Sequence, residues 1–434
     1  MKIAILAKNP YYFKGEKITP YLAGHSIGFV APFIEYLIKR GHKVSIISPK
    51  EYKSEEEIES KFFNKPPKSK NFFNFFVEEA KFPKVPFNFG DLMFQNAIIK
   101  AKKTMGGLDI VLVVYIFPWI VAVNYLKKDI GFKTVAFLRG SDVFSGCFRD
   151  SDYKKLVSDK ETWDEIVNVM VSSLNKSDLV YSVSNMLKRF AGRQGIKVDK
   201  ICPTPPFPNS QGIKEVKRTK EQSKKAFLRN KFIRKQFGKI NKDTKWIAYL
   251  GRLHSEKQVS LVVDAFNLSK NHKGISLIIA GTGLEKKNLQ ERKAKMGLKN
   301  MHIGFVPPKL VPLFCKSIDI MIHPATPQSF MDARPSSCMN AAFMGVPVIF
   351  PYKEGIEGTG LSESVSSANK KFLAVNPNLS SSKLSKEVAK KIDLLFSNKK
   401  LYNKISAANS RFAARFEAYK LFKNVEKELR KCLR

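Results

Sequence analysis

Residues 319–350 read DIMIHPATPQSFMDARPSSCMNAAFMGVPVIF, and the interpretation of the whole chain depends on them. An apolar strand is predicted at the start of this stretch, followed by a polar loop and a short helix. The strand places Asp332 beyond its carboxyl end, and the helix carries Asn340 about one turn in. Ligands of open α/β sheets bind at that edge. The letters D-x-R-P-S-S are also ordinary turn and helix-cap chemistry, so the stretch alone leaves a ligand site and a capped loop both open.

Apolar strands and amphipathic helices alternate along most of the chain, which predicts doubly wound parallel sheets. The segments predicted as strands are Lys2–Ala7, Val44–Ile47, Asp109–Tyr115, Lys133–Leu138, Leu179–Val183, Trp246–Leu250, Ile275–Ala280, His302–Phe305, Asp319–His323 and Val346–Phe350. The pattern restarts at Trp246, and 434 residues exceed one ordinary core, so two similar domains are expected. We place them at 1–208 and 246–400, joined by a basic connection over 209–245. A C-terminal helix over 401–434 is expected to pack back toward the first domain.

The composition favours a cytoplasmic protein without a disulfide framework. The five cysteines are odd in number, scattered and without C-x-x-C spacing, which also argues against structural zinc. The longest apolar run, Ile110–Val123, contains Pro118 and is shorter than the roughly 20 residues that a membrane-spanning helix needs. The first residues are too short an apolar run for a signal peptide and are predicted as a strand.

The net charge is strongly positive, since 76 basic residues stand against 38 acidic ones and give +38. Such an excess attracts nucleic acid, anionic lipid or phosphorylated substrates. A lysine-rich composition spread over every solvated face explains the same number. Residues 61–84 interleave seven Phe with six Lys. They either form a loop that dips Phe72, Phe73, Phe75 and Phe76 into a lipid interface, or pack these rings on the domain.

Several chemistries are excluded by missing motifs. Gly281-x-Gly283 is followed by Lys286 rather than by the third glycine of a dinucleotide fingerprint, and neither a P-loop nor a G-x-S-x-G elbow occurs. Asp150-Ser151-Asp152 does not end an apolar strand and is interpreted as a turn, so no metal is expected. Arg252 directly follows a strand, and Ser255–Gln258 reads as a capping box that puts Lys257 in a helix's first turn. Two cations at a helix start suit a diphosphate, although two solvated charges would look the same.

Nine motifs in order resemble one family over residues 1 to about 350. They are AGHS, RGHKVSIIS, RGSDV, KSDLVYSVS, GRLHSEK, AGTGLEKKNL, HIGFV, DIMIHPA and the D-x7-N stretch with NAAFMGVPVI. The family is that of retaining, nucleotide-sugar-dependent glycosyltransferases of the GT-B fold, family 4. The resemblance implies two facing Rossmann-like domains with an interdomain cleft, the acceptor bound by the first and the donor mainly by the second.

The resemblance also implies roles for individual residues. Asp332 would face the transferred sugar, Arg139 would lie beside it, and Arg252 and Lys257 would stabilise the leaving diphosphate, as catalytic residues. The implied donor-binding residues are Gly24, His25, Arg252, Lys257, Gly281, Gly283, Ser336, Ser337 and Asn340. No metal and no cofactor are implied, because the leaving phosphate itself can accept the proton from the acceptor hydroxyl.

This sequence departs from the family pattern at four positions. Asn340 replaces a carboxylate that accepts from ribose hydroxyls, and Asp332 is one methylene shorter than the family's glutamate. Arg139 stands where many relatives carry histidine, and Gln258 stands where a glycine often follows the lysine. An arginine cannot act as a base, but it can stabilise phosphate or orient the acceptor.

The expected activity is transfer of a hexose-type sugar, with retention, from a UDP- or GDP-sugar to a hydroxyl acceptor. The acceptor would be a glycolipid or cell-surface polysaccharide precursor, with the enzyme cytoplasmic and peripheral on the inner face of an anionic membrane. Two alternatives stay open from the charge: glycosylation of nucleic acid, which is the less favoured partner, and a non-catalytic polyanion-binding protein on the same scaffold.

Overall fold

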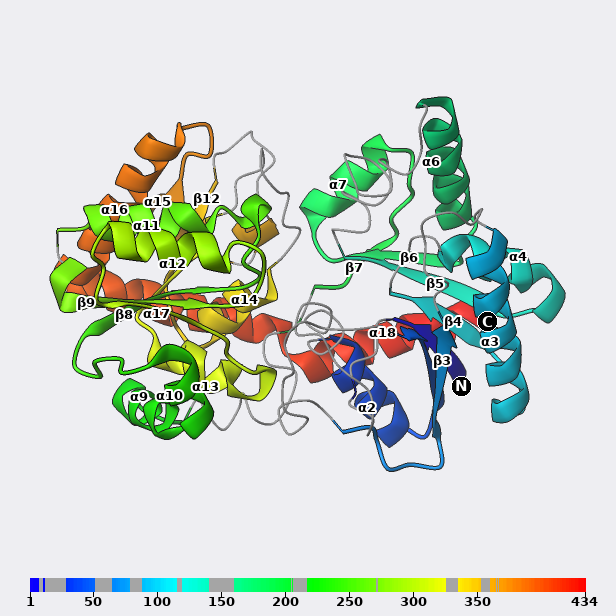
Figure 1. Ribbon diagram of the computed structural model, residues 1–434. Coiled ribbons are helices and arrows are strands. Elements are labelled where there is room, and N and C mark those ends of the chain that lie inside the picture. Colours follow the sequence, from blue (N-terminus) through cyan, green and yellow to red (C-terminus); the bar gives the residue numbers. More distant parts are fainter. Residues whose placement is uncertain are drawn as a thin grey trace. The chain divides into compact units, whose positions relative to one another are not determined.

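The computed structural model divides into two compact units (Figure 1). It describes residues 1–7, 11, 29–50, 65–78, 88–114, 119–139, 160–203, 205, 217–270, 272–324, 335–352, 360–363, 365 and 367–434. Unit 1 comprises Met1–Thr204 with Tyr419–Arg434, and unit 2 comprises Pro205–Ala418. Each unit has a parallel sheet covered by helices, so the predicted doubly wound α/β architecture is confirmed.

Unit 1 contains a seven-stranded sheet of order β3-β2-β1-β4-β5-β6-β7, in which all strand pairs are parallel. Its strands are β1 Lys2–Leu6, β2 Lys43–Lys50, β3 Phe72–Glu78, β4 Ile110–Val113, β5 Lys133–Leu138, β6 Leu179–Ser182 and β7 Lys200–Ile201. Its helices are α2 Ala31–Lys39, α3 Asn88–Met105, α4 Trp119–Ile130, α6 Lys160–Asn175, α7 Asn185–Arg193 and α18 Ala418–Cys432. The order reverses between β1 and β4, and that point is where ligands of such sheets bind.

Unit 2 repeats this plan with a six-stranded parallel sheet of order β10-β9-β8-β11-β12-β13. Its strands are β8 Lys245–Leu250, β9 Ile275–Ala280, β10 Met301–Gly304, β11 Ile320–Ile322, β12 Val348–Pro351 and β13 Ala374–Val375. Its helices are α9 Lys220–Arg229, α10 Lys231–Phe237, α11 Val259–Leu268, α12 Lys286–Lys295, α13 Val311–Ser317, α14 Ser336–Phe343, α15 Ser367–Leu373, α16 Ser381–Ser397 and α17 Lys399–Ala413.

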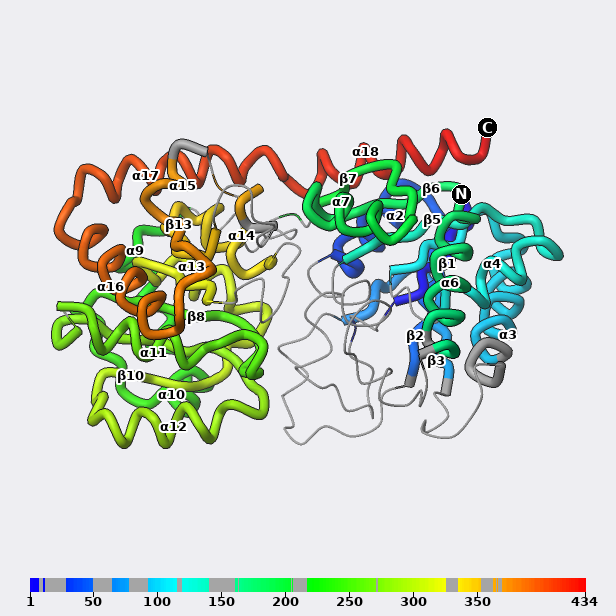
Figure 2. The backbone as a smooth tube through the Cα atoms, turned by 90° about the horizontal axis from the view of Figure 1, so that it is seen from above, coloured from blue at the N-terminus to red at the C-terminus, as the bar shows by residue number. Residues whose placement is uncertain are grey.

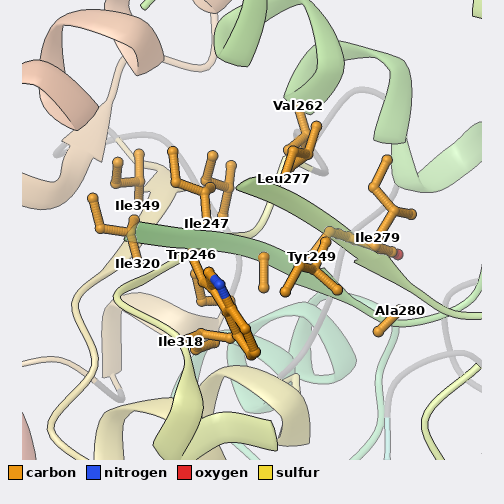
Figure 3. Packing of buried hydrophobic residues seen from close by; sticks show 14 of the residues in the cluster. Trp246, Ile247, Tyr249, Val262, Leu277, Ile279, Ala280, Ile318, Ile320 and Ile349 are labelled. Atoms are coloured by element: carbon orange, nitrogen blue, oxygen red, sulfur yellow. The ribbon is translucent and has the colours of Figure 1, made fainter. Parts of the chain in front are cut away.

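The central strand β8 organises the core of unit 2, because its side chains alternate between two buried faces. Ile247 and Leu277 lie on the side of Val262 from α11, whereas Trp246 lies with Ile318 on the other side (Figure 3). Helices α11 and α16 pack together on one side of the sheet, and α9 and α13 pack together on the other (Figure 1). None of the helices in the described part combines the length and the apolar character that crossing a bilayer requires.

The boundaries of the units differ from the expected segments. Residues 217–244, expected as a connection, contain α9 and α10, and these helices bury Phe227, Ile233 and Phe237 in the core of unit 2. Low apolar periodicity hid this packing, since only about one side chain per helical turn points inward. The C-terminal segment is also two helices rather than one: α17 belongs to unit 2, and α18 belongs to unit 1 from Tyr419 onward.

The phenylalanine-rich segment forms a strand where the structure describes it. Residues Phe72–Glu78 are β3, paired in parallel with β2 at the edge of the sheet, and Phe72 to Phe76 are half-buried. Phe72 also contacts the ring of Tyr11 at 5.4 Å between centroids. Of the two interpretations, the structure therefore favours packing for these rings, and residues 61–64 and 79–84 lie outside the described residues.

Four of the described aspartates fasten neighbouring strands at the amino edges of the two sheets. Each aspartate directly precedes a strand. Its N–H donates to the carbonyl of one residue on the adjacent strand, and its carboxylate accepts the N–H of that same residue. The four are Asp109 on Lys2, Asp178 on Thr134, Asp199 on Val180 and Asp319 on Trp246, with carboxylate oxygen to nitrogen distances of 2.7–2.8 Å. We call this contact the aspartate clasp, and it fixes the register of parallel neighbours that have no turn to fix it.

Asp319 is the most deeply buried of the four, and it also holds two lysines. Its oxygens lie 2.7 Å from Lys220 Nζ and 3.4 Å from Lys224 Nζ, and Tyr402 Oη donates to its carbonyl. Burial opposes the charged form, but the two lysines and the hydrogen bonds outweigh it and hold the pKa of Asp319 below its usual range. This carboxylate therefore ties α9 and α17 to the start of β11.

Helix α18 is held on unit 1 by a second buried carboxylate, that of Glu426. Glu426 accepts hydrogen bonds from Tyr36 Oη at 2.7 Å, from Arg430 Nη2 at 2.7 Å and from His42 Nε2 at 3.0 Å, with Arg40 Nε at 3.4 Å. Burial opposes ionisation, yet these donors lower the pKa of Glu426 to about 2. In Figure 2, α18 (red) lies near α2, the helix that contains Tyr36.

Replacing Asp319 with Asn should lower the free energy of unfolding by about 3 kcal/mol, because the buried lysines lose their counter-charge. Urea unfolding followed by circular dichroism measures this. The matched control is Asp199→Asn, which alters an exposed clasp without a buried cation and should cost less than about 1 kcal/mol. Equal losses in the two variants would show that the lysine contacts of Asp319 contribute nothing beyond the clasp.

The Glu426 contact should make the attachment of α18 sensitive to acid. Because the folded-state pKa is lowered from 4.5 to about 2, its contribution is fully present above about pH 4.5 and is lost as the pH falls toward 2. Glu426→Gln should therefore be less stable than the parent by about 3 kcal/mol at pH 7, with the difference shrinking below pH 4.5. Thermal unfolding from pH 3 to 7 tests this, and a difference independent of pH contradicts it.

Candidate active site

The turn after β8 brings together the two cations predicted to hold a diphosphate. Arg252 follows the strand, and Lys257 ends a 3-10 turn over Ser255–Lys257. This turn lies at the carboxyl end of β8, next to the point where the strand order of unit 2 reverses. Lys257 is buried, with 7% of its surface exposed, whereas the Arg252 side chain has 32% of its surface exposed. The structure thus places both side chains in one short segment at the predicted ligand edge.

The turn after β9 packs directly against the turn after β8. Leu253 donates its N–H to Thr282 at 2.8 Å, and Leu253 in turn accepts from Glu285 at 3.0 Å. A Cβ at Gly281 would lie 1.9 Å from the carbonyl oxygen of Gly251, and one at Gly283 would lie 2.3 Å from that of Leu253. Both glycines are thus required for the two turns to pack, and their predicted contact with the donor stays a prediction.

Glu256 is a charged residue of this turn that the sequence analysis did not single out. Its carboxylate lies 2.8 Å from Arg252 Nη2 and 3.7 Å from His254 Nδ1. The spacing of four residues from Arg252 was the available signal, since residues four apart meet on a helical surface. The carboxylate holds the guanidinium in place and offsets part of its charge in the absence of an anion.

The predicted capping box is wrong. Ser255 does not cap a helix; His254 precedes the 3-10 turn without a side-chain cap, and α11 begins only at Val259. Between them Gln258 has φ 50° and ψ 40°, and it is the non-glycine residue with positive φ among the described residues. Glycine adopts this left-handed conformation without strain, and the turn places Lys257 before the helix rather than within its first turn.

Helix α14 supplies the second part of the site in unit 2. It begins at Ser336 after Pro335, with no side-chain cap, so the N–H groups of its first turn have no acceptor within the helix. Ser336 and Ser337 are half-buried in that turn, and half-buried Asn340 follows one turn later, as predicted. These positions suit hydrogen bonds to an anion or to hydroxyl groups. Asp332 lies outside the described residues.

In unit 1, Arg139 lies directly beyond the carboxyl end of β5. Its guanidinium carbon is 4.5 Å from the centre of the Phe29 ring, a cation–π distance. Phe29 is buried and packs edge-on against Phe422 of α18, with ring centres 5.8 Å apart. Arg139 is therefore half-buried and oriented at the ligand edge of its own sheet. Gly24 and His25 lie outside the described residues.

Neither metal ligation nor thiol chemistry is indicated by the described part of the chain. No group of three or more His, Cys, Asp or Glu with metal-binding geometry occurs among those residues. Cys202, Cys315, Cys338 and Cys432 are free thiols, the first three buried. Burial raises the pKa of the Cys315 thiol, which makes it a poor nucleophile.

Two tandem Rossmann-like units define the GT-B fold, and solved structures of that fold match the whole chain. Anabaena HepE in complex with UDP aligns with 14% identity and a TM-score of 0.69, covering 99% of this chain and 100% of that one. WaaG, a glycosyltransferase involved in lipopolysaccharide biosynthesis, aligns with 12% identity and a TM-score of 0.66, covering 98% and 99%. At this identity the likeness establishes the fold, and the predicted GT-B fold is confirmed.

The family resemblance is confirmed for the second unit. Residues 215–412 match the family model described as Glycosyl transferases group 1, which is nearly the extent of unit 2. A comparison with curated proteins gives no match. The family match and the fold together support a glycosyltransferase, and the finer assignment to family 4 stays a prediction.

Replacing Gln258 with Gly should stabilise the protein, because glycine adopts the left-handed conformation without a Cβ clash. We expect the free energy of unfolding to rise by about 0.5–1 kcal/mol, measured by urea unfolding. Gln258→Ala is the control, since alanine keeps the Cβ and should give no gain. An equal gain with alanine would assign the cost instead to the amide oxygen of Gln258, which is buried without a hydrogen-bond partner among the described residues.

Proposed function

We propose that the protein is a retaining, metal-independent glycosyltransferase that takes a hexose-type sugar from a UDP- or GDP-sugar. The observation that carries this is the single turn that presents Arg252 and Lys257 at the carboxyl end of β8. HepE, whose fold this chain shares, has structures in complex with UDP and with UDP-glucose, which supports the UDP form of the donor. Unit 2 would bind the donor, and unit 1 the acceptor.

The diphosphate would be held by charge and by backbone N–H groups. Arg252 and Lys257 supply two positive charges, and the first turn of α14 supplies N–H donors beside Ser336 and Ser337. As the bond between the sugar and the phosphate breaks, negative charge grows on the leaving diphosphate, so these groups stabilise the transition state more than the ground state. A partly desolvated lysine is effective here, because water screens it little.

The sugar and ribose contacts follow from the family roles. Asp332 faces the transferred sugar, and Asn340 accepts from ribose hydroxyls through its amide oxygen, which is neutral where the family has a carboxylate. Arg139 orients the acceptor, since a guanidinium cannot act as a base. The acceptor hydroxyl attacks on the face from which the diphosphate leaves, and a phosphate oxygen takes its proton. No protein nucleophile, metal or cofactor is then needed.

The acceptor we propose is a glycolipid or polysaccharide precursor at the inner face of the cytoplasmic membrane. The +38 charge supports this place of action, since anionic lipids attract basic proteins. The enzyme would be cytoplasmic and peripheral rather than embedded.

Lys257→Ala should lower kcat/KM for the donor about 100-fold or more, because one stabilising charge is lost from the transition state. Hydrolysis of UDP- and GDP-sugars, together with thermal shifts by UDP and GDP, measures donor use and binding. Lys295→Ala is the control, since it removes an equal charge from an exposed position on α12. Unchanged turnover in Lys257→Ala, or no shift with any UDP-, GDP- or ADP-sugar, would refute the enzyme proposal.

A further inference from the structure

The segment from Lys217 to Lys245 carries an unusual density of unpaired positive charge. Nine of its lysines and arginines are exposed and form no ion pair with a carboxylate in the described part of the chain. They are Lys217, Lys225, Arg229, Lys231, Arg234, Lys235, Lys239, Lys242 and Lys245. Only two exposed carboxylates, those of Glu221 and Asp243, lie in the same segment. We call these nine residues the basic face.

Five of the nine residues of the basic face lie on the two helices α9 and α10, and the other four lie before α9, after α10 or at the start of β8. Lys225 and Arg229 lie one turn apart on α9, and Arg234 and Lys235 occupy the last turn of α10. The opposite sides of the helices are buried, since Phe227 and Phe237 belong to the core of unit 2. The two helices contact each other (Figure 1), so their exposed cations lie on neighbouring segments of unit 2.

A lysine-rich composition does not by itself explain this surface. Helix α6 shows that solvated helices of the chain also carry acids, since Glu161, Asp164 and Glu165 are all exposed there. Helix α16, which lies outside the basic face, carries an ion pair between two of its own side chains, those of Lys390 and Glu387, at 2.7 Å. The segment 217–245 has twelve basic residues against two acidic ones, and the mutual repulsion of these cations costs stability that an anionic partner can offset.

The surface is electrostatic in character, with no apolar anchor. None of the large exposed hydrophobic side chains of the described residues comes from 217–245. Leu228 and Phe232 are partly buried against the core instead. A face of this kind can rest on an anionic surface, but it cannot insert side chains into hydrocarbon. It also presents no exposed aromatic ring on which nucleic-acid bases could stack.

We infer that the basic face docks the protein on an anionic lipid bilayer through lipid phosphates. Seven of the nine cations are lysines, whose point charges suit mobile head groups, whereas fixed bidentate recognition of phosphate favours arginine. This inference deepens the proposed function, since a lipid-linked acceptor lies at such a surface. It assigns docking to unit 2 and not to the phenylalanine-rich strand β3, and it makes binding strongly dependent on salt.

Vesicle co-sedimentation with two charge-matched variants tests the inference. The first is Lys225→Gln/Arg229→Gln/Arg234→Gln/Lys235→Gln in the basic face. The second is Lys383→Gln/Lys386→Gln/Lys399→Gln/Lys400→Gln, which removes four exposed cations from α16 and α17 of the same unit. Circular dichroism and melting temperature establish that both variants fold like the parent.

The parent should bind phosphatidylcholine vesicles containing about a third phosphatidylglycerol and not vesicles of phosphatidylcholine alone. The basic-face variant should bind the anionic vesicles at least tenfold more weakly, and the α16–α17 variant within about twofold of the parent. Raising the salt from 0.05 to about 0.5 M should release the parent. Hydrolysis of the soluble donor should be unchanged in both variants, since neither alters the donor turn.

Three outcomes would overturn the inference. Equal losses in both variants would mean that net charge alone drives binding, and retained binding in the basic-face variant would place docking elsewhere. Tighter binding of single-stranded or duplex nucleic acid than of vesicles at the same salt, lost in the basic-face variant, would make nucleic acid the partner. Failure of sugar transfer is distinguishable from all three, because vesicle binding is measured without donor or acceptor.

Discussion

The aspartate clasp is a contact shared by the two sheets, and it joins three strand pairs of unit 1 and one of unit 2. A parallel strand has no hairpin turn to set its register, so the register must come from packing or from a specific contact at the strand's start. In this protein an aspartate directly before the strand provides that contact, with two hydrogen bonds to one residue of the neighbour. Because every clasp lies at an amino edge, these carboxylates are kept away from the carboxyl edges. The carboxyl edge of the unit 2 sheet, which is the proposed diphosphate site, carries Arg252 and Lys257, with Glu256 as a local counter-charge.

The precision of the site follows from contacts that are not themselves catalytic. The turn after β8 can lie on the turn after β9 only because Gly281 and Gly283 have no side chain in the way. That packing fixes Leu253, and through it the positions of Arg252 and of the 3-10 turn that ends at Lys257. The price is one non-glycine residue in the left-handed conformation, Gln258. Two cations held this rigidly would need little reorganisation on binding the proposed diphosphate, which is how preorganised charge contributes to catalysis.

Much of this architecture was predictable from sequence, because it depends on local patterns of apolar and polar residues. Ten of the thirteen described strands follow from short apolar runs, and the restart at Trp246 follows from repetition, whereas β3, β7 and β13 were not among the predicted strands. Arg252, Lys257 and Asn340 were predicted as site residues from positions counted from strand ends, and the structure places their segments after the strands β8 and β11 of unit 2; their roles stay a prediction. Contacts between residues distant in sequence could not be predicted. Glu426 contacts Tyr36, which lies 390 positions away in the chain, and no local sequence pattern indicates this contact. The packing of helices α9 and α10 in the core of unit 2 was missed because few apolar residues suffice to anchor a helix whose outer face is mostly charged.

The net charge of the described residues lies on the surface, because few of their charged side chains are buried. Asp319 and Glu426 are the buried acids of the described residues, and Lys224 and Lys257 are the buried cations, so burial leaves the net charge at the surface. Acids that are buried or form a clasp also pair with partly exposed basic side chains, as Glu426 does with Arg430 and Asp178 with Lys133. Repulsion among the remaining cations would be lowest if they were spread evenly over the helices. The twelve basic residues of 217–245, against two acidic ones, depart from an even spread, and their repulsion costs folding energy that an external anion can offset.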